Sequence, residues 1–198
     1  MRFIAPALLF VPFFAVAANP QYESLKTMDG GVLYCQSATV GQTGYRLENT
    51  LVEPSAKDAQ TLEVNFAPNF YRCAKGANGY EWQASNVTAF LSQSVKTDAG
   101  IVKIVPTSYA WVVYSENYTE LNPQPSVKVA GGQKYTVTLN DLLSGEQKSN
   151  HQKGVASRGI LTVFMKYVTK AVYPNGKEEN LGLHATSSFN IVITVPGN

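Results

Sequence analysis

The chain of 198 residues is poor in the side chains that most often carry enzyme chemistry. It has two cysteines and two histidines, and charged residues make up only 15% of the sequence. The histidines, His151 and His184, lie far apart, and neither has a neighbour at metal-ligand spacing. Hydrolase elbows, zinc-protease helices, phosphate loops and dinucleotide-binding fingerprints are all absent from the sequence. We therefore predict a protein that is not an enzyme and that uses no metal or other cofactor.

Runs of like charge are also missing. The 16 basic and 14 acidic residues are interspersed and give a net charge of +2 at pH 7. Nucleic-acid binding requires a basic stripe or patch, so we predict no nucleic-acid partner. Beyond the N-terminal region, no apolar stretch reaches the roughly 20 residues that a membrane-spanning helix requires.

The N-terminus has the pattern of a secretory signal peptide. Arg2 precedes an apolar run over 3–17, which ends in the small-x-small pattern Ala-Val-Ala. This run is short for a membrane span and contains two prolines, which disfavour a stable helix. We predict that 1–17 is a cleaved signal peptide, that 18–198 is the mature chain, and that the protein is secreted or periplasmic. No transmembrane segment is predicted after signal removal.

The two cysteines, Cys35 and Cys73, both follow the predicted signal peptide. An exported protein meets an oxidising compartment, where an even number of cysteines is typical of disulfide bonding. Neither a CxxC spacing nor a histidine cluster accompanies them, which disfavours a metal site. We predict a Cys35–Cys73 disulfide that stabilises the fold by about 4 kcal/mol through the loop that it closes.

Alternation of apolar and polar residues is the dominant pattern of the chain. In the segment 61–66, Leu62, Val64 and Phe66 share one face of a strand while the residues between them share the other. Similar segments are separated by glycine, asparagine and proline turn signals. Strands are predicted at 31–37, 43–48, 61–66, 69–74, 79–84, 101–105, 109–115, 126–130, 134–139, 161–168 and 189–195.

Helical signal is weak by comparison. The segment 86–95 fits either a helical turn or a strand, and we favour the strand. One helical turn is predicted within 138–146, capped by Asn140 and ended by Gly145.

These patterns predict an all-β fold: an antiparallel β-sandwich, immunoglobulin-like in the broad sense, with about 8 to 11 short strands and little helix. Cys35, Cys73 and Trp82 are similar to the set found in immunoglobulin-like domains. There, however, the tryptophan lies between the cysteines, so the resemblance extends only to the architecture. We predict a single domain over 18–198, with a sub-division near 120–132 as the alternative.

Two segments are candidate binding loops. An Asn-Gly turn signal within 69–83 predicts a hairpin with an exposed tip. The segment 144–159 is long, polar and free of strand pattern, and loops of this length are uncommon in compact domains unless functional or disordered. The candidate binding residues are Lys75, Asn78 and Tyr80 in the first segment and Lys148, His151, Lys153 and Arg158 in the second.

The function predicted from these features is binding. We expect an exported, non-catalytic β-sandwich that recognises a protein or a surface glycan in an adhesion, envelope or inhibitor role. Its exposed sheet edges are either blunted or used for strand addition to a partner. The alternatives are a β-barrel carrier of a small apolar ligand and a secreted hydrolase with an unrecognised site. Asn86 and Asn117 begin glycosylation sequons, which matter only in a eukaryotic host.

Overall fold

The computed structural model describes residues 24–55, 58–121 and 132–198. The predicted signal peptide over 1–17 and the predicted strand at 126–130 lie outside the described residues.

Strands account for most of the described chain, and three short α-helices and one 3-10 turn accompany them. In the N-terminal half these elements are β1 (Ser24–Lys26), β2 (Val32–Tyr34), η2 (Ser37–Thr39), β3 (Thr43–Ser55), β4 (Asp58–Gly76), β5 (Gly79–Ala84), α1 (Val87–Leu91), β6 (Gln93–Thr97) and β7 (Gly100–Tyr114). The C-terminal half contains β8 (Glu120–Leu121), β9 (Gln133–Thr138), α2 (Leu139–Leu142), α3 (Gly145–Gln152), β10 (Ser157–Val172), β11 (Glu178–Ala185) and β12 (Phe189–Val195).

The strands form two antiparallel sheets. In the first sheet the order is β2-β1-β3-β4-β5, and β9 pairs with an earlier part of β4. In the second sheet the order is β11-β10-β7-β6, with β12 paired to β10 and β8 paired to β7. The predicted antiparallel β-sandwich is confirmed, and the described strands leave free edges instead of closing into a barrel.

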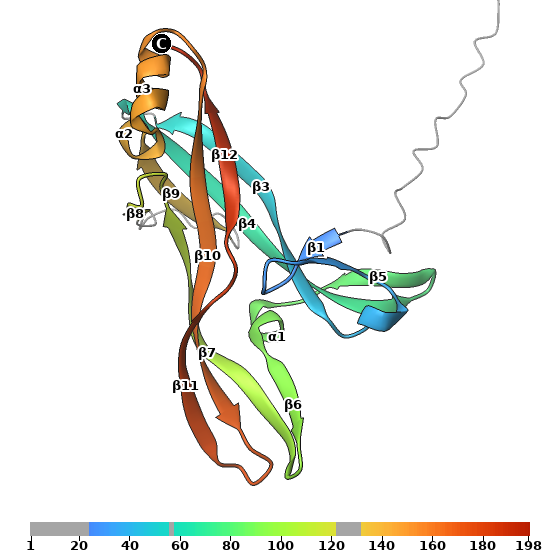
Figure 1. Cartoon of the computed structure of the whole chain (residues 1–198). Helices are drawn as coiled ribbons and strands as arrows, with labels where there is room; N and C mark the ends of the chain where they lie inside the picture. Colours follow the sequence, from blue (N-terminus) through green and yellow to red (C-terminus); the bar gives the residue numbers. More distant parts are fainter. Residues whose placement is uncertain (1–23, 56–57, 122–131) are drawn as a thin grey trace, which may run out of the picture.

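The two sheets cover each other at one end of the molecule and diverge at the other (Figure 1). We call the part that carries β1, β2 and β5 the cysteine arm, residues 24–46 and 69–84. The part that carries β6 and β11 is the lower arm, residues 93–109 and 167–185. Helix α1 lies at the fork between the two arms (Figure 1). Each sheet contains strands that precede the segment 120–132 in the sequence and strands that follow it. In the first sheet β4 pairs with β9, and in the second β7 pairs with β10.

Several predicted strands are pieces of longer ones. The segments 61–66 and 69–74 both belong to β4, and 101–105 and 109–115 both contribute to β7. Strand β10 alternates buried and less buried residues along its whole length, in agreement with the alternation in its sequence. Long strands of this kind connect the sandwich to the arms.

The main hydrophobic core lies between the sheets where they overlap. Val64 and Phe66 of β4 pack against residues of the other sheet, namely Val113 of β7 and Leu161 and Val163 of β10. Each of these five residues is at most 1% exposed. Burying each of these side chains contributes roughly 1.5–3 kcal/mol. A second cluster at the fork consists of Tyr45, Phe90, Leu91, Met165 and Tyr167.

The predicted Cys35–Cys73 disulfide is confirmed. It joins the segment after β2 to β4 in the cysteine arm, with 5.1 Å between the two Cα atoms, and both cysteines are buried. A disulfide of this kind is typical of proteins in an oxidising, extracytoplasmic compartment.

The strand prediction for 86–95 is wrong in its first half. Asn86 accepts a hydrogen bond from the Ala89 N–H at 2.8 Å and caps α1, after which β6 begins at Gln93. The helical turn places the consecutive residues Phe90 and Leu91 both in the core, whereas a strand would direct them to opposite faces.

The segment 144–159 is not a loop, and this prediction is also corrected. Its first part forms α3, where Ser144 and Gln147 make a reciprocal capping box. That Ser-x-x-Gln spacing is a helix-start signal in the sequence. The preceding turn, α2, is capped by Thr138 instead of Asn140, and Gly145 opens α3 instead of ending a helix.

Candidate functional site

The predicted tip in the cysteine arm is a tight hairpin between β4 and β5. Lys75 lies opposite Tyr80, and the last pair is Gly76 with Gly79, so the two-residue turn is one position earlier than Asn-Gly. Lys75 and Asn78 are exposed, whereas Tyr80 is half-buried. The tip therefore presents a lysine and an asparagine to solvent.

The second predicted group lies on and beside α3. Lys148 and His151 are half-buried on this helix, Lys153 follows it, and Arg158 is exposed at the start of β10. His151 Nδ1 lies 2.7 Å from the Pro196 carbonyl oxygen, which attaches the helix to the C-terminal segment. The structure thus assigns His151 a structural contact.

The two predicted groups do not form one surface. The β4–β5 tip lies at the end of the cysteine arm, and α3 lies at the far end of the sandwich (Figure 1). Neither His151 nor His184 forms a hydrogen bond or ion pair with a carboxylate within the described ranges. The described residues also contain no cluster of histidine, cysteine and carboxylate side chains that could hold a metal ion.

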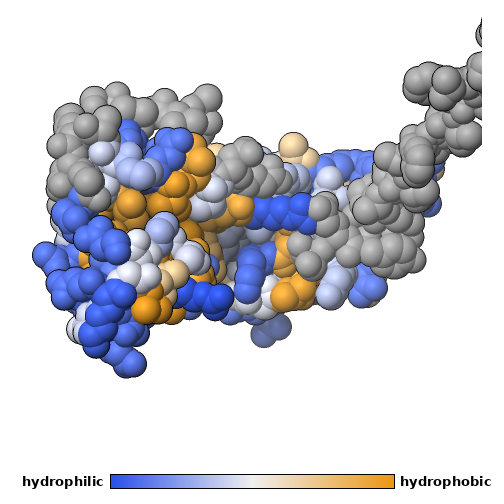
Figure 2. All heavy atoms as spheres, turned by 90° about the horizontal axis from the view of Figure 1, so that it is seen from above, coloured by the Kyte–Doolittle hydropathy of each residue, from blue (hydrophilic) through white to orange (hydrophobic). Residues whose placement is uncertain are grey.

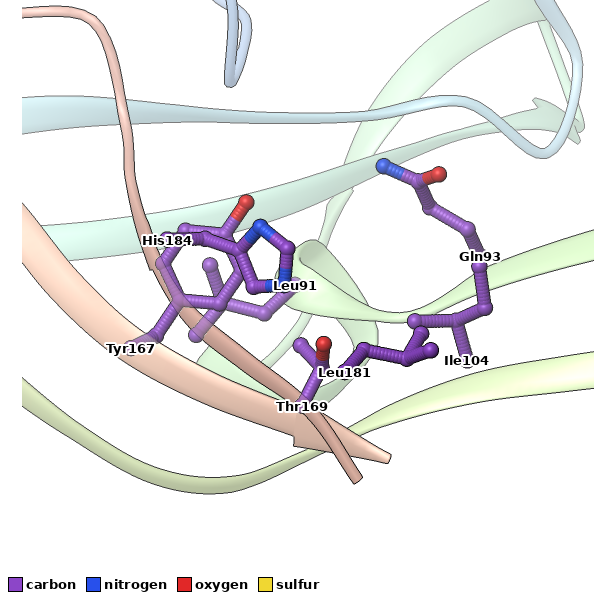
Figure 3. Close-up of a pocket in the computed structure, with 7 residues that line it drawn as sticks. All are labelled: Leu91, Gln93, Ile104, Tyr167, Thr169, Leu181 and His184. Carbon is purple, nitrogen blue, oxygen red and sulfur yellow. The ribbon is translucent and has the colours of Figure 1, made fainter. Parts of the chain in front are cut away.

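A pocket of about 140 Å³ lies on the inner face of the lower arm (Figure 3). It is open to solvent on one side, and all four strands of the arm together with α1 contribute to it. We call it the Thr169 pocket; its lining residues are Leu91, Gln93, Ile104, Tyr167, Thr169, Leu181 and His184.

Thr169 occupies an unusual position in the sheet. The register of β10 shifts between Val168 and Thr169 relative to β7, and between Thr169 and Lys170 relative to β11. The second irregularity leaves Leu181 without a partner in the ladder, beside Gly182 at φ +85°. Bulges often occur beside binding sites because they redirect side chains. Here both bulges adjoin one pocket residue.

The polar groups of the Thr169 pocket differ in their environments. Thr169 is only 2% exposed, and its Oγ1 forms no hydrogen bond with the described residues. His184 stacks on Tyr167 with ring centroids 5.4 Å apart. Burial raises the pKa of Tyr167, whose hydroxyl contacts the sulfur of Met28. In Figure 3 these two rings stand on one side of Thr169, and Ile104 and Gln93 stand on the other.

A second candidate region is the open side of the sandwich, between the edges of β3 and β12. Two hollows of about 370 and 380 Å³ follow one another along these strands, and we call them together the β3–β12 groove. Its lining residues are Lys26, Tyr45, Leu47, Val52, Pro54, Leu62, Ser188, Phe189, Asn190, Val192, Ile193, Thr194, Val195 and Pro196. Lys26 is the single charged residue among these described side chains.

Both strands that border the groove have an unpaired edge. β12 pairs only with β10 in the described part of the chain, and β3 pairs only with β4 over Leu47–Pro54. Apolar side chains also gather on the sandwich body between hydrophilic rims when the molecule is seen from above (Figure 2). A free edge beside apolar side chains is the arrangement that accepts an additional strand.

Comparison with known proteins gave no match from which a function could be inferred, so any functional conclusion rests on the fold and on these two regions. No protein-family model matches the chain, and the searches of curated proteins and of solved structures found no significant match. Within the described residues, no helix has the length and apolar character needed to span a membrane.

Neither region was predicted from the sequence. Thr169 does carry a signal, because it continues the inward positions Leu161, Val163, Met165 and Tyr167 with a polar side chain. A polar residue in phase with a buried face often marks a functional position. The groove has no local signal, because its two walls come from segments more than 130 positions apart.

Proposed function

We propose that this protein is an exported, non-catalytic binding module that takes an extended segment of a partner protein into the β3–β12 groove. One observation carries the proposal: two strand edges that are unpaired in the part of the chain that the structure describes flank a groove lined mainly by apolar side chains. An added strand would satisfy backbone groups of β12 and bury alternate side chains in the groove.

The charge of the groove constrains its occupant. Lys26 lies at one end, next to Tyr45 and Phe189, and no acidic side chain lines either hollow among the described residues. An apolar segment with an acidic residue or a carboxylate at the Lys26 end is therefore the complementary partner.

A glycan fits this groove less well than a protein segment. Sugar hydroxyl groups project in several directions, and apolar walls such as Val52 and Leu62 would leave them without partners. The disulfide and the predicted signal peptide support an extracytoplasmic setting. Adhesion, envelope assembly and inhibition are the roles compatible with strand addition there.

The test uses a heptapeptide library displayed on phage and selected against the immobilised protein. Selected peptides should alternate apolar and other residues and should protect β12 amides from hydrogen exchange. Val192→Glu, within the groove, should abolish binding, because a charge on an edge strand opposes strand addition. Val95→Glu is the matched control on β6: the two valines are 58% and 45% exposed.

Two results would overturn the proposal. One is a selection that yields no alternating peptides. The other is equal binding of the selected peptides to Val192→Glu and Val95→Glu. Lys26→Gln should weaken only those peptides that carry an acidic group at the corresponding end.

A further inference from the structure

The Thr169 pocket is unrelated to the groove and shares no residue with it. Its central feature is a hydroxyl that is removed from solvent and has no hydrogen-bond partner among the described residues. Buried polar groups are nearly always paired, and an exception in a native fold calls for an explanation. A ligand that bonds to Thr169 Oγ1 provides one.

The walls of the pocket define the shape of such a ligand. Leu91, Ile104 and Leu181 supply aliphatic surface, and the stacked rings of Tyr167 and His184 supply an aromatic side (Figure 3). The volume of about 140 Å³ is close to that of a cavity of roughly 150 Å³ that holds one benzene ring. Aromatic rings also favour tilted or offset contacts with other rings.

The polar groups define its chemistry. No lysine, arginine, aspartate or glutamate is among the described lining residues, so the pocket offers an ionised ligand no permanent counter-charge. Thr169 Oγ1 can both donate and accept a hydrogen bond. A neutral hydroxyl on the ligand therefore suits it.

We propose that the Thr169 pocket binds a single aromatic ring that carries a hydroxyl group, with Thr169 Oγ1 as its hydrogen-bond partner. The ring comes either from a free phenol or from a tyrosine side chain of a partner. The second source is compatible with the position of the pocket, because Gln93 belongs to the exposed edge strand β6.

Methyl NMR provides a direct test, because four lining residues, Leu91, Ile104, Thr169 and Leu181, carry methyl groups. Titration with p-cresol should shift these signals saturably. Toluene, which has the same ring without the hydroxyl, should bind about tenfold more weakly. In Thr169→Val the preference for p-cresol over toluene should disappear, and Thr169→Ser should restore it.

Two further ligands distinguish a free phenol from a partner's tyrosine side chain as the source of the ring. They are N-acetyl-tyrosine-N-methylamide and a peptide with a central tyrosine, each compared with its phenylalanine counterpart. Binding of p-cresol alone assigns the site to a free phenol. Tighter binding of the tyrosine peptide, with protection of β6 amides, assigns it to a partner's side chain. The proposal is overturned if p-cresol leaves the four methyl signals unchanged. It is also overturned if toluene binds equally well, or if a crystal soaked in p-cresol shows only an ordered water at Thr169.

Discussion

The hydroxyl of Tyr167 donates a hydrogen bond to the sulfur of Met28 across 3.5 Å, although the residues are 139 positions apart in sequence. Met28 belongs to the turn between β1 and β2 in the cysteine arm, and Tyr167 lies on β10 where the lower arm begins. The backbone N–H of Ser187 also donates to the Met28 carbonyl at 2.9 Å. The two arms are therefore attached to each other at the fork.

The aromatic ring of Tyr167 should contribute more to this attachment than its hydroxyl does. A thioether is a weak acceptor, so Tyr167→Phe should lower the free energy of unfolding by less than about 1 kcal/mol. Tyr167→Ala removes a ring buried in the fork cluster and should cost about 3–5 kcal/mol. Urea unfolding of both variants measures the difference, and equal losses would contradict the assignment.

Two buried threonines should respond in opposite directions when each is replaced by valine. The Thr169 hydroxyl has no hydrogen-bond partner among the described residues, so Thr169→Val should raise the free energy of unfolding by about 1 kcal/mol. Thr186 Oγ1 accepts a hydrogen bond from the Met165 N–H at 2.9 Å, so Thr186→Val should lower it by about 1–3 kcal/mol. Thermal and urea unfolding test the pair. Destabilisation of Thr169→Val by a similar amount would show that its hydroxyl is bonded.

Loss of the disulfide should be costly. Cys35 and Cys73 are separated by 38 positions, and in the chain-entropy model the closed loop stabilises the fold by about 4 kcal/mol. The Cys35→Ala/Cys73→Ala variant should show this loss, and wild type treated with a reductant should approach it. Iodoacetamide should label neither cysteine in the native, unreduced protein. Labelling of Cys73 under those conditions would exclude the bond.

Stability should fall steeply at alkaline pH because of two buried tyrosines. Burial raises the pKa of Tyr45 to about 12, and burial together with the charge of Glu120 raises the pKa of Tyr135 to about 12. A raised folded-state pKa means that the stabilisation is complete below the unfolded value near 10 and is lost as pH rises towards 12. The loss should therefore occur between pH 10 and 12.

Phenylalanine variants test this pH dependence. Tyr45→Phe removes the ionisable group without removing the ring, so its free energy of unfolding should decline less steeply than that of wild type above pH 10. Tyr135→Phe also loses the hydrogen bond to the Trp111 carbonyl, at 3.2 Å, so its stability should already be lower at pH 7. Parallel curves for wild type and Tyr45→Phe would rule out this origin.

Local sequence patterns predicted much of the fold. The inward positions of β10, from Leu161 to Tyr167, follow from alternation, and the structure buries each of them. The disulfide follows from cysteine parity and the expected compartment. Helix α3 was missed although its capping box was present, because a short polar helix with no buried residue lacks the hydrophobic periodicity that identifies most helices.

The candidate sites depend on contacts that no local pattern contains. Val52 and Val192 line the same groove because the two sheets pack against each other. The Thr169 pocket depends on the register shifts of β10 relative to its two neighbours, β7 and β11. The predicted binding residues instead include Lys75 at the end of β4 and Lys148 on α3. The β4–β5 tip and α3 lie on distant parts of the molecule (Figure 1).

The sequence by itself determined which residues face inward in the strands with clear alternation, that the fold is an antiparallel sandwich, and that Cys35 and Cys73 pair. These properties follow from the two-residue period of a strand and from the chemistry of single side chains. Only the tertiary structure decided where the sheets diverge and, within the described ranges, which strand edges are unpaired and that the Thr169 hydroxyl is enclosed without a hydrogen-bond partner. Sheet packing and strand register depend on many contacts between residues that are far apart in the sequence, so a local pattern does not determine them.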